Sequence, residues 1–479
     1  MKTYQMLING EWVNALSGEF FDDLNPYTGE LYAHVAKGDK KDADRAMSAA
    51  YKAREPWSSM PPIERSRILF KAAQLLEENK QEYAEVLVNE GGGAIGKVMF
   101  EVVQTVDLLQ TAAGDCKCIL GETFHSDPGK ISMTMLSPKG TVVAISPWNF
   151  PLILSMYKVA YALATGNTVV LKPASETPVI GLKIGELFEK AGLMPGALNI
   201  LTGPGKVLGD ALIGDHRCSL VTLTGETGTG RHVAMKAAEN LKEYILELGG
   251  KNPLIILEDA DIDFAVNAAA FGTFLHQGQV CMAVGRIIIA QEKSEEFSVK
   301  LAEKAASLSK GDPTLHNTVV GPLINDNQVK KVDALVRDAV AKGAKLLQGG
   351  RYEGRVYDPT VLMDVRPDME IYYEETFGPI ASIIPVKNEK EALDVANDTV
   401  YGLVAGVITK DNHKALYLAE GLEAGMVHIN DTSIDVDASC PFGGYKRSGR
   451  GREGGRYSIE EYSEVKWVTI QKKEKIFPF

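Results

Sequence analysis

The sequence predicts an α/β fold with two open parallel sheets in tandem. The chain has 479 residues, of which 45% are hydrophobic and 24% charged, an ordinary globular composition. At roughly 100–200 residues per domain, this length suggests about two to four domains. From residue 140 onward, short apolar runs alternate with helical periodicity, which is typical of parallel strands joined by helices on both faces.

Before that point the chain is expected to form short strands and then helices. In the first 35 residues, apolar stretches alternate with turn signals such as Asn9-Gly10 and Asn25-Pro26. Between residues 41 and 90, apolar side chains recur at spacings of three and four, which predicts helix. Pro61-Pro62 marks a break, so two helices are expected there.

Two α/β units follow. The strands of the first are expected at 141–146, 168–171, 198–201, 220–223 and 244–248, and its helices at 152–164, 179–191, 207–213 and 230–240. The strands of the second are expected at 254–257, 286–290, 380–385, 404–409 and 426–429, and its helices at 264–275, 295–310 and 329–342. Two such units suggest a cleft between them. The segment 465–471 alternates like a single exposed strand, and such a strand usually pairs with another chain.

The charge balance and the cysteines argue against several classes of protein. A net charge of −12 argues against nucleic acid or an anionic membrane as the main partner. The five cysteines are odd in number and no pair has CxxC spacing, so reduced thiols are expected, without disulfides or a metal site. Neither a signal peptide nor an apolar run of about 18 residues is found. The protein is therefore expected to be soluble and cytoplasmic.

Cys281 is the first candidate for chemistry. In FLHQGQVCMA (274–283) it follows a Gly-Gln turn between a helix and a strand, where a thiol can face a cleft and a lowered pKa would make it a nucleophile. The alternative is a buried structural cysteine, which a lone cysteine more often is. A hydrolase pair with His276 is disfavoured, because such partners usually come from distant segments.

Polar residues also follow the expected strands of the first unit. Glu247, in LELGGKN, is placed where α/β sheets bind ligands, and it would act as a general base if desolvation raised its pKa. The alternative is a solvated charge at the end of a strand. Asn149, in PWNFP, offers an NH₂ donor suited to an oxyanion. Lys172 ends the next strand and could reach a ribose or phosphate.

The glycine-rich stretches differ in their context. The GxGxxG matches at 91–96 and 449–454 follow no expected strand, so neither qualifies as a dinucleotide fingerprint. The stretch 203–209 has the context but one residue too many. TGETGTG (224–230) follows a strand and precedes a helix, which suits a pyrophosphate at a helix N-terminus.

Taken in order, these stretches resemble the aldehyde dehydrogenase superfamily along nearly the whole chain, from INGEWV near the start to PFGGYKRSG at 441–449. The specific motifs are PWNFP (147–151), KPASETP (172–178), LTGETGTG (223–230), LELGGKNP (246–253), GQVCMA (278–283) and EETFGP (374–379). Six motifs in the family's order argue against a chance match. The C-terminal block further resembles the branch that acts on benzaldehyde, salicylaldehyde and vanillin.

The resemblance implies a mechanism for this chain. The Cys281 thiolate would attack the aldehyde carbon to give a thiohemiacetal, with the oxyanion held by the Asn149 side chain and the Cys281 backbone N–H. Hydride would pass to the nicotinamide and leave a thioester. Glu247 would activate the water that hydrolyses this thioester.

The resemblance also implies a site for NAD or NADP. The cofactor residues it indicates are Lys172 at the adenosine ribose, Glu375 at the nicotinamide ribose, Phe377 against the nicotinamide ring, and Trp148 and Gly225 along the dinucleotide. Ser175 stands where many NAD-preferring members have Glu, so NADP is expected to be accepted too. Glu226 stands where the family usually has Ser, beside the pyrophosphate, and its side chain is expected to turn away.

The substrate is expected to be an aromatic or other apolar aldehyde. The mouth of the tunnel should draw on the segment 428–440 and on Leu154, Tyr157, Val280, Met282 and Phe442, which are mostly apolar. The alternatives are an aliphatic aldehyde or semialdehyde, a CoA-acylating dehydrogenase, and a catalytically silent protein on the same fold. CoA-acylating members generally lack the Glu found at position 247.

The resemblance finally implies a division of the chain. A Rossmann-like dinucleotide-binding domain would comprise 1–122 and 140–247, and a catalytic domain 248–440. A small β arm for oligomerisation would comprise 123–139 and 456–479, giving a homodimer or homotetramer.

Overall fold

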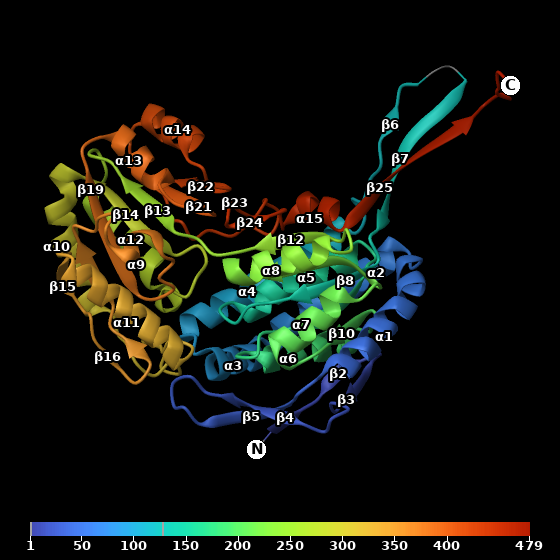
Figure 1. Ribbon diagram of the computed structural model, residues 1–479, viewed down its shortest axis with the longest axis horizontal. Coiled ribbons are helices and arrows are strands. Elements are labelled where there is room, and N and C mark those ends of the chain that lie inside the picture. Colours follow the sequence, from blue (N-terminus) through green and yellow to red (C-terminus); the bar gives the residue numbers. More distant parts are fainter. Residues whose placement is uncertain (1, 127–128) are drawn as a thin grey trace.

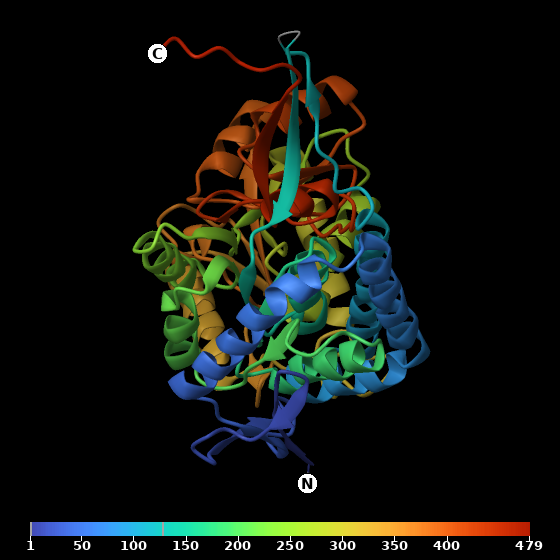
Figure 2. The same ribbon diagram turned by 90° about the vertical axis from the view of Figure 1, so that its right-hand side faces the viewer.

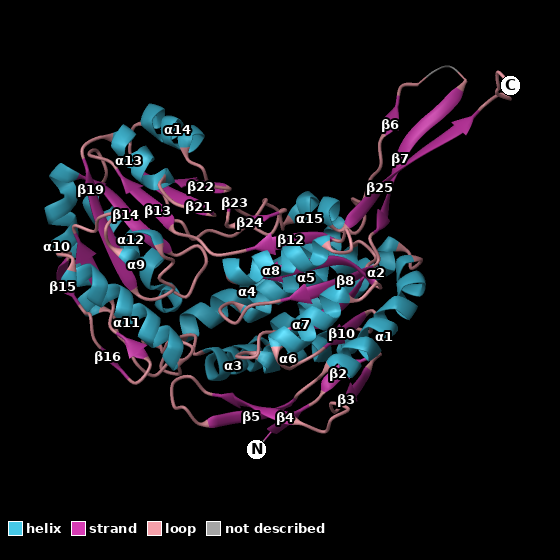
Figure 3. Ribbon diagram, viewed as in Figure 1, coloured by secondary structure: helices cyan, strands magenta, loops and turns pink. Residues whose placement is uncertain are grey.

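Two α/β bodies lie side by side, and a narrow β arm projects from one of them (Figure 1). The computed structural model describes residues 2–126 and 129–479. Each body is built around one large sheet with helices on both faces, as the colouring by secondary structure in Figure 3 shows. The α/β class with two sheets in tandem is therefore confirmed.

The first sheet has eight strands with a parallel centre. Its order is β24 (Gly449–Arg450), β12 (Glu243–Glu247), β11 (Cys218–Thr224), β8 (Thr141–Ile145), β9 (Thr168–Lys172), β10 (Leu198–Ile200), β2 (Met6–Ile8) and β3 (Glu11–Val13). The strands from β12 to β10 run parallel, whereas β24, β2 and β3 add antiparallel edges. The parallel centre matches the predicted strands, and the antiparallel edges were not predicted.

Alternate residues of the central strands pack against two separate cores. Val142 and Ala144 of β8 join one cluster, and Val143 joins the other, because side chains along a strand point to opposite faces. The helices on the first face are α2 (Pro62–Glu78), α3 (Lys80–Gly91), α4 (Ile95–Asp115), α5 (Pro151–Ala164) and α6 (Pro178–Lys190). Those on the second face are α1 (Lys40–Ser58), α7 (Gly205–Gly214) and α8 (Thr227–Ala238).

Helix α5 is buried along its whole length, because α4 covers the side that faces away from the sheet. The sequence analysis did not predict α4, although Val98, Val102, Val106 and Leu109 recur at helical spacing. The region between residues 41 and 90 forms three helices where two were expected, since a new helix begins directly after Asn79. The N-terminal strands β1 (Lys2–Tyr4), β4 (Phe20–Leu24) and β5 (Leu31–Ala36) form a small separate sheet.

The second sheet has seven strands, of which only an edge strand is antiparallel. Its order is β15 (Lys345–Gln348), β18 (Thr360–Met363), β19 (Ile380–Val386), β14 (Val284–Ala290), β13 (Asn252–Ile256), β21 (Val404–Ile408) and β22 (Met426–Ile429). Its helices are α9 (Ile262–Phe274), α10 (Gln291–Ser307), α11 (Asp326–Ala341), α12 (Glu370–Tyr373), α13 (Glu389–Asn397) and α14 (Asn412–Gly421). The short elements β16 (Tyr352–Glu353), β17 (Val356–Tyr357), β20 (Tyr401–Gly402), β23 (Tyr445–Lys446) and α15 (Gly455–Glu461) lie in the connections.

The arm is a three-stranded sheet of β6 (Thr123–Phe124), β7 (Lys130–Pro138) and β25 (Ser463–Gln471), and Figure 2 shows it extending beyond both bodies. Strand β25 pairs with β7 of the same chain along its full length. The expectation that this strand lacks a partner within the chain is therefore wrong, because β7 is a long hairpin strand that the sequence analysis did not identify. Within the described residues, no helix is long and apolar enough to cross a membrane.

Candidate active site

Two cavities meet at Cys281, which among the described residues is the one common to both walls. The polar cavity has a volume of about 440 Å³ and runs along the carboxyl ends of β8, β9, β11 and β12. Its lining includes Trp148, Asn149, Lys172, Ser175, Gly225, Glu226, Thr229, Gly249, Glu375 and Phe377. The apolar tunnel reaches Cys281 between α4, α5 and the segment 434–442.

The loop before Cys281 has an unusual backbone. His276 and Gln277 both have left-handed φ angles, of 49° and 55°, which non-glycine residues seldom adopt. The side chain of Gln277 holds this conformation, since it donates to the Pro322 carbonyl at 2.8 Å and accepts from the Gly321 N–H at 3.0 Å. A Cβ at Gly278 would lie 2.1 Å from the Gly378 carbonyl oxygen, so only glycine fits. These contacts fix the position of the thiol.

Burial raises the pKa of the Cys281 thiol to about 12, and the nearby carboxylates Glu375 and Glu247 raise it further. The expectation of a lowered pKa at this cysteine is therefore wrong, because its surroundings are desolvated and acidic. A thiol of this kind reacts only when a base removes its proton at the moment of use.

Glu247 ends strand β12 and is buried, and within residues 2–126 and 129–479 neither of its carboxylate oxygens has a hydrogen-bond partner. Desolvation raises its pKa well above the usual range, and the neighbouring Glu453 adds to this effect. The reading of Glu247 as a solvated charge is excluded by this burial. A carboxylate with a raised pKa near a thiol is suited to proton transfer at neutral pH.

Asn149 lies in the turn between β8 and α5, and its side chain points to the cysteine loop. One N–H of its amide donates to the Gln279 carbonyl at 3.0 Å, two residues before Cys281. An amide NH₂ group has two donors, so the second remains for another acceptor. Asn149 and Cys281 both line the polar cavity.

The far end of the polar cavity offers groups that suit a nucleotide. Lys172 is buried there, which lowers the pKa of its ammonium to about 8. The Ser175 hydroxyl donates to the Gly203 carbonyl at 3.1 Å. Helix α8 begins beside Gly225 without a side-chain cap on its first N–H groups. Free N–H groups at a helix N-terminus favour a phosphate.

Glu226 lines the polar cavity and accepts a hydrogen bond of 3.4 Å from the Thr229 hydroxyl. Its carboxylate therefore lies along the first turn of α8. The expectation that this side chain turns away from a bound pyrophosphate stays a prediction. The Thr229 hydroxyl, three residues later in the same helix, offers the carboxylate a donor within the cavity wall.

The near end of the polar cavity is formed by Trp148, Phe377 and Glu375. The two rings meet edge to face, with centroids 5.3 Å apart. Glu375 accepts from the Gly250 N–H at 3.0 Å, and a Cβ at Gly249 would lie 2.4 Å from its carboxylate. Gly249 therefore leaves the space for the Glu375 carboxylate, and Gly250 supplies the N–H that holds it. The cavity as a whole fits a nicotinamide dinucleotide.

All five residues expected in the substrate tunnel line the apolar cavity, together with others that were missed. The expected ones are Leu154, Tyr157, Val280, Met282 and Phe442, and the missed ones are Phe100, Glu101, Phe150, Ile153, Ile434 and Val436. Ile434 and Val436 belong to the segment 428–440 that was expected at the mouth. Tyr157 and Phe442 are stacked, with ring centroids 6.3 Å apart, so aromatic side chains form much of the wall.

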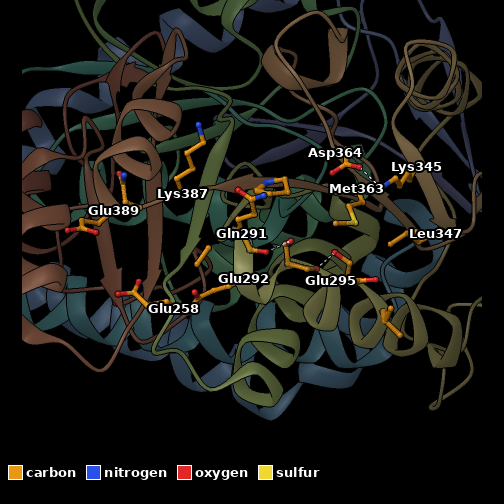
Figure 4. Close-up of a pocket in the computed structure, with 16 residues that line it drawn as sticks. Glu258, Gln291, Glu292, Glu295, Lys345, Leu347, Met363, Asp364, Lys387 and Glu389 are labelled. Atoms are coloured by element: carbon orange, nitrogen blue, oxygen red, sulfur yellow. Dashed lines mark hydrogen bonds and ion pairs between the residues drawn. The ribbon is translucent and has the colours of Figure 1, made fainter.

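His276 and a second large cavity lack the arrangement of reactive groups found around Cys281. His276 packs edge-on against Phe150, and no hydrogen bond to Cys281 is found among the described residues. An open cavity of about 1110 Å³ lies at the carboxyl end of the second sheet, and Figure 4 shows glutamates such as Glu258, Glu292 and Glu295 around it. It contains no cysteine or histidine. In the described part of the chain, no group of three or more His, Cys, Asp or Glu side chains could hold a metal ion.

The fold and the two cavities define a class of protein, the nucleotide-dependent oxidoreductases with a thiol at the point where the cavities meet. Comparisons with known proteins identify the family. A sequence model of the aldehyde dehydrogenase family matches residues 12–468. The chain belongs to the aldehyde dehydrogenase family, and its activity is the NAD(P)-dependent oxidation of an aldehyde.

Several members of the family are similar over their full length. Benzaldehyde dehydrogenase [NAD(+)] of Pseudomonas putida is 40% identical over 99% of this chain and 98% of its own. Vanillin dehydrogenase of Pseudomonas fluorescens is 39% identical over 99% of each chain. The crystal structure of a salicylaldehyde dehydrogenase from Pseudomonas putida G7, complexed with salicylaldehyde, is 38% identical, with a TM-score of 0.98 over 100% of both chains.

Proposed function

We propose that this enzyme oxidises a small aromatic aldehyde to the carboxylic acid through a covalent intermediate on Cys281. The observation that supports the proposal most is the junction of an apolar tunnel with aromatic walls and a dinucleotide cavity at one thiol. In the part of the chain that the structure describes, no basic side chain lines the tunnel to bind a substrate carboxylate or phosphate. Three relatives that act on benzaldehyde, vanillin and salicylaldehyde agree with an aromatic substrate.

In the first half of the reaction the thiol of Cys281 loses its proton to a base, and Glu247 is one of the two buried carboxylates, with Glu375, whose charge acts on the thiol pKa. The thiolate forms a carbon–sulfur bond with the aldehyde carbon. The carbonyl oxygen becomes an oxyanion, which accepts hydrogen bonds from the free N–H of the Asn149 amide and the Cys281 backbone N–H. Donors fixed in advance stabilise this charge without reorganisation.

When bound, NAD or NADP supplies the acceptor for the hydride that leaves the thiohemiacetal carbon. Lys172, Ser175, Gly225 and the N-terminus of α8 would hold its adenosine and phosphate part, and Trp148, Glu375 and Phe377 its nicotinamide part. Glu247 then removes a proton from water, which attacks the thioester carbon. The carbon–sulfur bond breaks, the acid leaves, and Cys281 is restored.

Steady-state oxidation of an aldehyde panel with NAD and with NADP tests the proposal, with Cys281→Ala as the inactive control. We expect the highest kcat/KM for benzaldehyde and its ring-substituted forms. A kcat/KM for succinic semialdehyde far above that for benzaldehyde would overturn the aromatic assignment. Thioester formation that requires CoA would indicate the acylating reaction, and no reduced cofactor with any aldehyde would indicate a silent protein.

We further propose a cytoplasmic homodimer or homotetramer assembled through the arm. The outer strand β25 leaves one edge unpaired in the sheet order β25-β7-β6, and it exposes Val465 and Trp467. An exposed apolar edge strand is a template for pairing with another chain. The division proposed for the chain places the cofactor domain at 1–122 and 140–247, the catalytic domain at 248–440, and the arm at 123–139 and 456–479.

A further inference from the structure

A buried ion pair on α4 lies directly beneath the loop that carries Asn149. Lys97 and Glu101 are one turn apart, and their side chains are 3% and 0% exposed. The Lys97 ammonium is 2.5 Å from the Glu101 carboxylate. Because desolvation largely offsets the attraction within a buried pair, such a pair is weak evidence for a role in stability. Its other contacts indicate what it does.

The hydrogen bonds that the two side chains make outside the pair go to the turn between β8 and α5 and to the first turn of α5. The ammonium of Lys97 donates to the backbone carbonyl of Asn149 at 2.8 Å and lies 4.0 Å from the centre of the Phe150 ring. The second oxygen of Glu101 accepts from the Leu152 and Ile153 N–H groups at 2.8 and 3.3 Å. Helix α5 has no cap from its own N-cap residue, so Glu101 satisfies its first N–H groups from outside.

The two ends of Asn149 are thus held by different elements. Its backbone carbonyl is bound by Lys97 of α4, and its side-chain amide is bound by the Gln279 carbonyl in the cysteine loop. We propose that Lys97 and Glu101 are positioning residues for Asn149, which keep its free amide N–H directed at the oxyanion on the substrate. The proposal rests on the proposed function, in which Asn149 is an oxyanion donor.

Lys97 provides the cleaner test, because Glu101 also lines the tunnel whereas Lys97 lines neither cavity. We expect Lys97→Met to lower kcat for the aldehyde by about 10- to 100-fold, since a misplacement of about 1 Å can cost about 100-fold. The Kd for NAD should stay within about twofold, because the cofactor residues lie on other elements. Glu101→Gln should lower kcat in the same direction, and the double variant should cost little more than the larger single effect.

Two reactions of Cys281 distinguish positioning of the oxyanion donor from general damage. Hydrolysis of p-nitrophenyl acetate passes through an oxyanion but needs no hydride transfer, so its rate should fall in proportion to kcat. Alkylation by iodoacetamide forms no oxyanion, so its rate should be unchanged. Ser66→Ala is the matched control, because it removes a buried hydrogen bond to the Ala113 carbonyl near the other end of α4. Ser66→Ala should leave kcat, the rate of ester hydrolysis and the rate of alkylation unchanged.

The outcomes separate this inference from the proposed function. Equal losses in alkylation and ester hydrolysis for Lys97→Met would overturn the inference, as would a kcat within twofold of wild type. If Asn149→Ala lowers kcat by at least 100-fold and Lys97→Met does not, only the positioning role fails. If Asn149→Ala leaves kcat unchanged, the oxyanion assignment itself fails. Circular dichroism and Tm on each variant verify that it folds.

Discussion

Cys281 and Glu247 are two acids in desolvated surroundings, and the charge of Glu247 adds to the cost of ionising the thiol. Burial holds the thiol pKa near 12 and keeps the pKa of Glu247 well above its usual range. Both groups are therefore harder to ionise than they would be in water, and the thiolate forms only when a base accepts its proton. This arrangement protects the thiol from unproductive reactions while the site is empty of substrate.

The raised pKa of Glu247 has a consequence for the pH profile. Glu247 acts on water only as the carboxylate, so hydrolysis of the thioester should slow as pH falls through this raised pKa and quicken as pH rises above it. We expect Glu247→Gln to form reduced cofactor in a burst of about one equivalent and then turn over at least about 100-fold more slowly. Stopped-flow absorbance at 340 nm measures both phases. A normal steady-state rate in this variant would contradict the role of Glu247.

Ser175 is the residue that we expect to decide whether the adenosine pocket tolerates a 2′-phosphate. Its hydroxyl donates to the Gly203 carbonyl, and no carboxylate stands at this position. We expect Ser175→Glu to lower kcat/KM for NADP by at least about tenfold relative to NAD, because like charges side by side cost binding energy. Ser175→Ala is the control and should leave the ratio nearly unchanged. An unaltered ratio in Ser175→Glu would show that the 2′-phosphate binds elsewhere.

At the scale of elements, the glycine pair after β12 of the first sheet lets Glu375, which precedes β19 of the second sheet, come close. A Cβ at Gly249 would lie 2.4 Å from the Glu375 carboxylate, and Glu375 comes from the other sheet's side of the cavity. We expect Gly249→Ala to displace Glu375 and raise the KM for NAD about tenfold or more. Gly114→Ala has nothing within 4 Å of the added carbon and serves as the control. An unchanged KM in Gly249→Ala would show that Glu375 does not hold the cofactor.

Elements were predictable from sequence where their signals are local. The strand and helix pattern from residue 140 onward reads directly as apolar runs and helical spacing, and the structure reproduces it. Helix α4 has such spacing too, but it was not predicted, because the glycines at 91–96 were considered only as a nucleotide motif. The partner of β25 was not predictable, because pairing between residues 130–138 and 463–471 is set by the folded chain and by no local signal.

The candidate site was predictable by a different route. Cys281, Glu247 and Asn149 come from distant segments, so only their resemblance to known motifs grouped them before the structure did. The thiol pKa depends on the burial of Cys281 and on which carboxylates lie near it. Both are set by the folded chain, so the sequence alone did not predict the pKa. The role of Lys97 and Glu101 likewise depends on which loop α4 lies against.

At the scale of the whole molecule, the arm is the part through which we expect copies of the chain to assemble. Val465 and Trp467 project from β25, with 69% and 66% of their surface exposed. We expect Val465→Glu together with Trp467→Glu to convert an oligomer to a monomer, since a charge on an edge strand opposes pairing. Light scattering after size-exclusion chromatography measures the mass. Lys466→Glu is the control on the neighbouring residue, and an unchanged mass in the double variant would place the interface elsewhere.

Because the two cavities have only Cys281 in common among the described residues, we expect aldehyde and dinucleotide to approach the thiol from different sides. The same separation allows the tunnel wall to accumulate substitutions that change the choice of aldehyde without disturbing the nucleotide. One fold can in this way serve many aldehydes with a single redox chemistry.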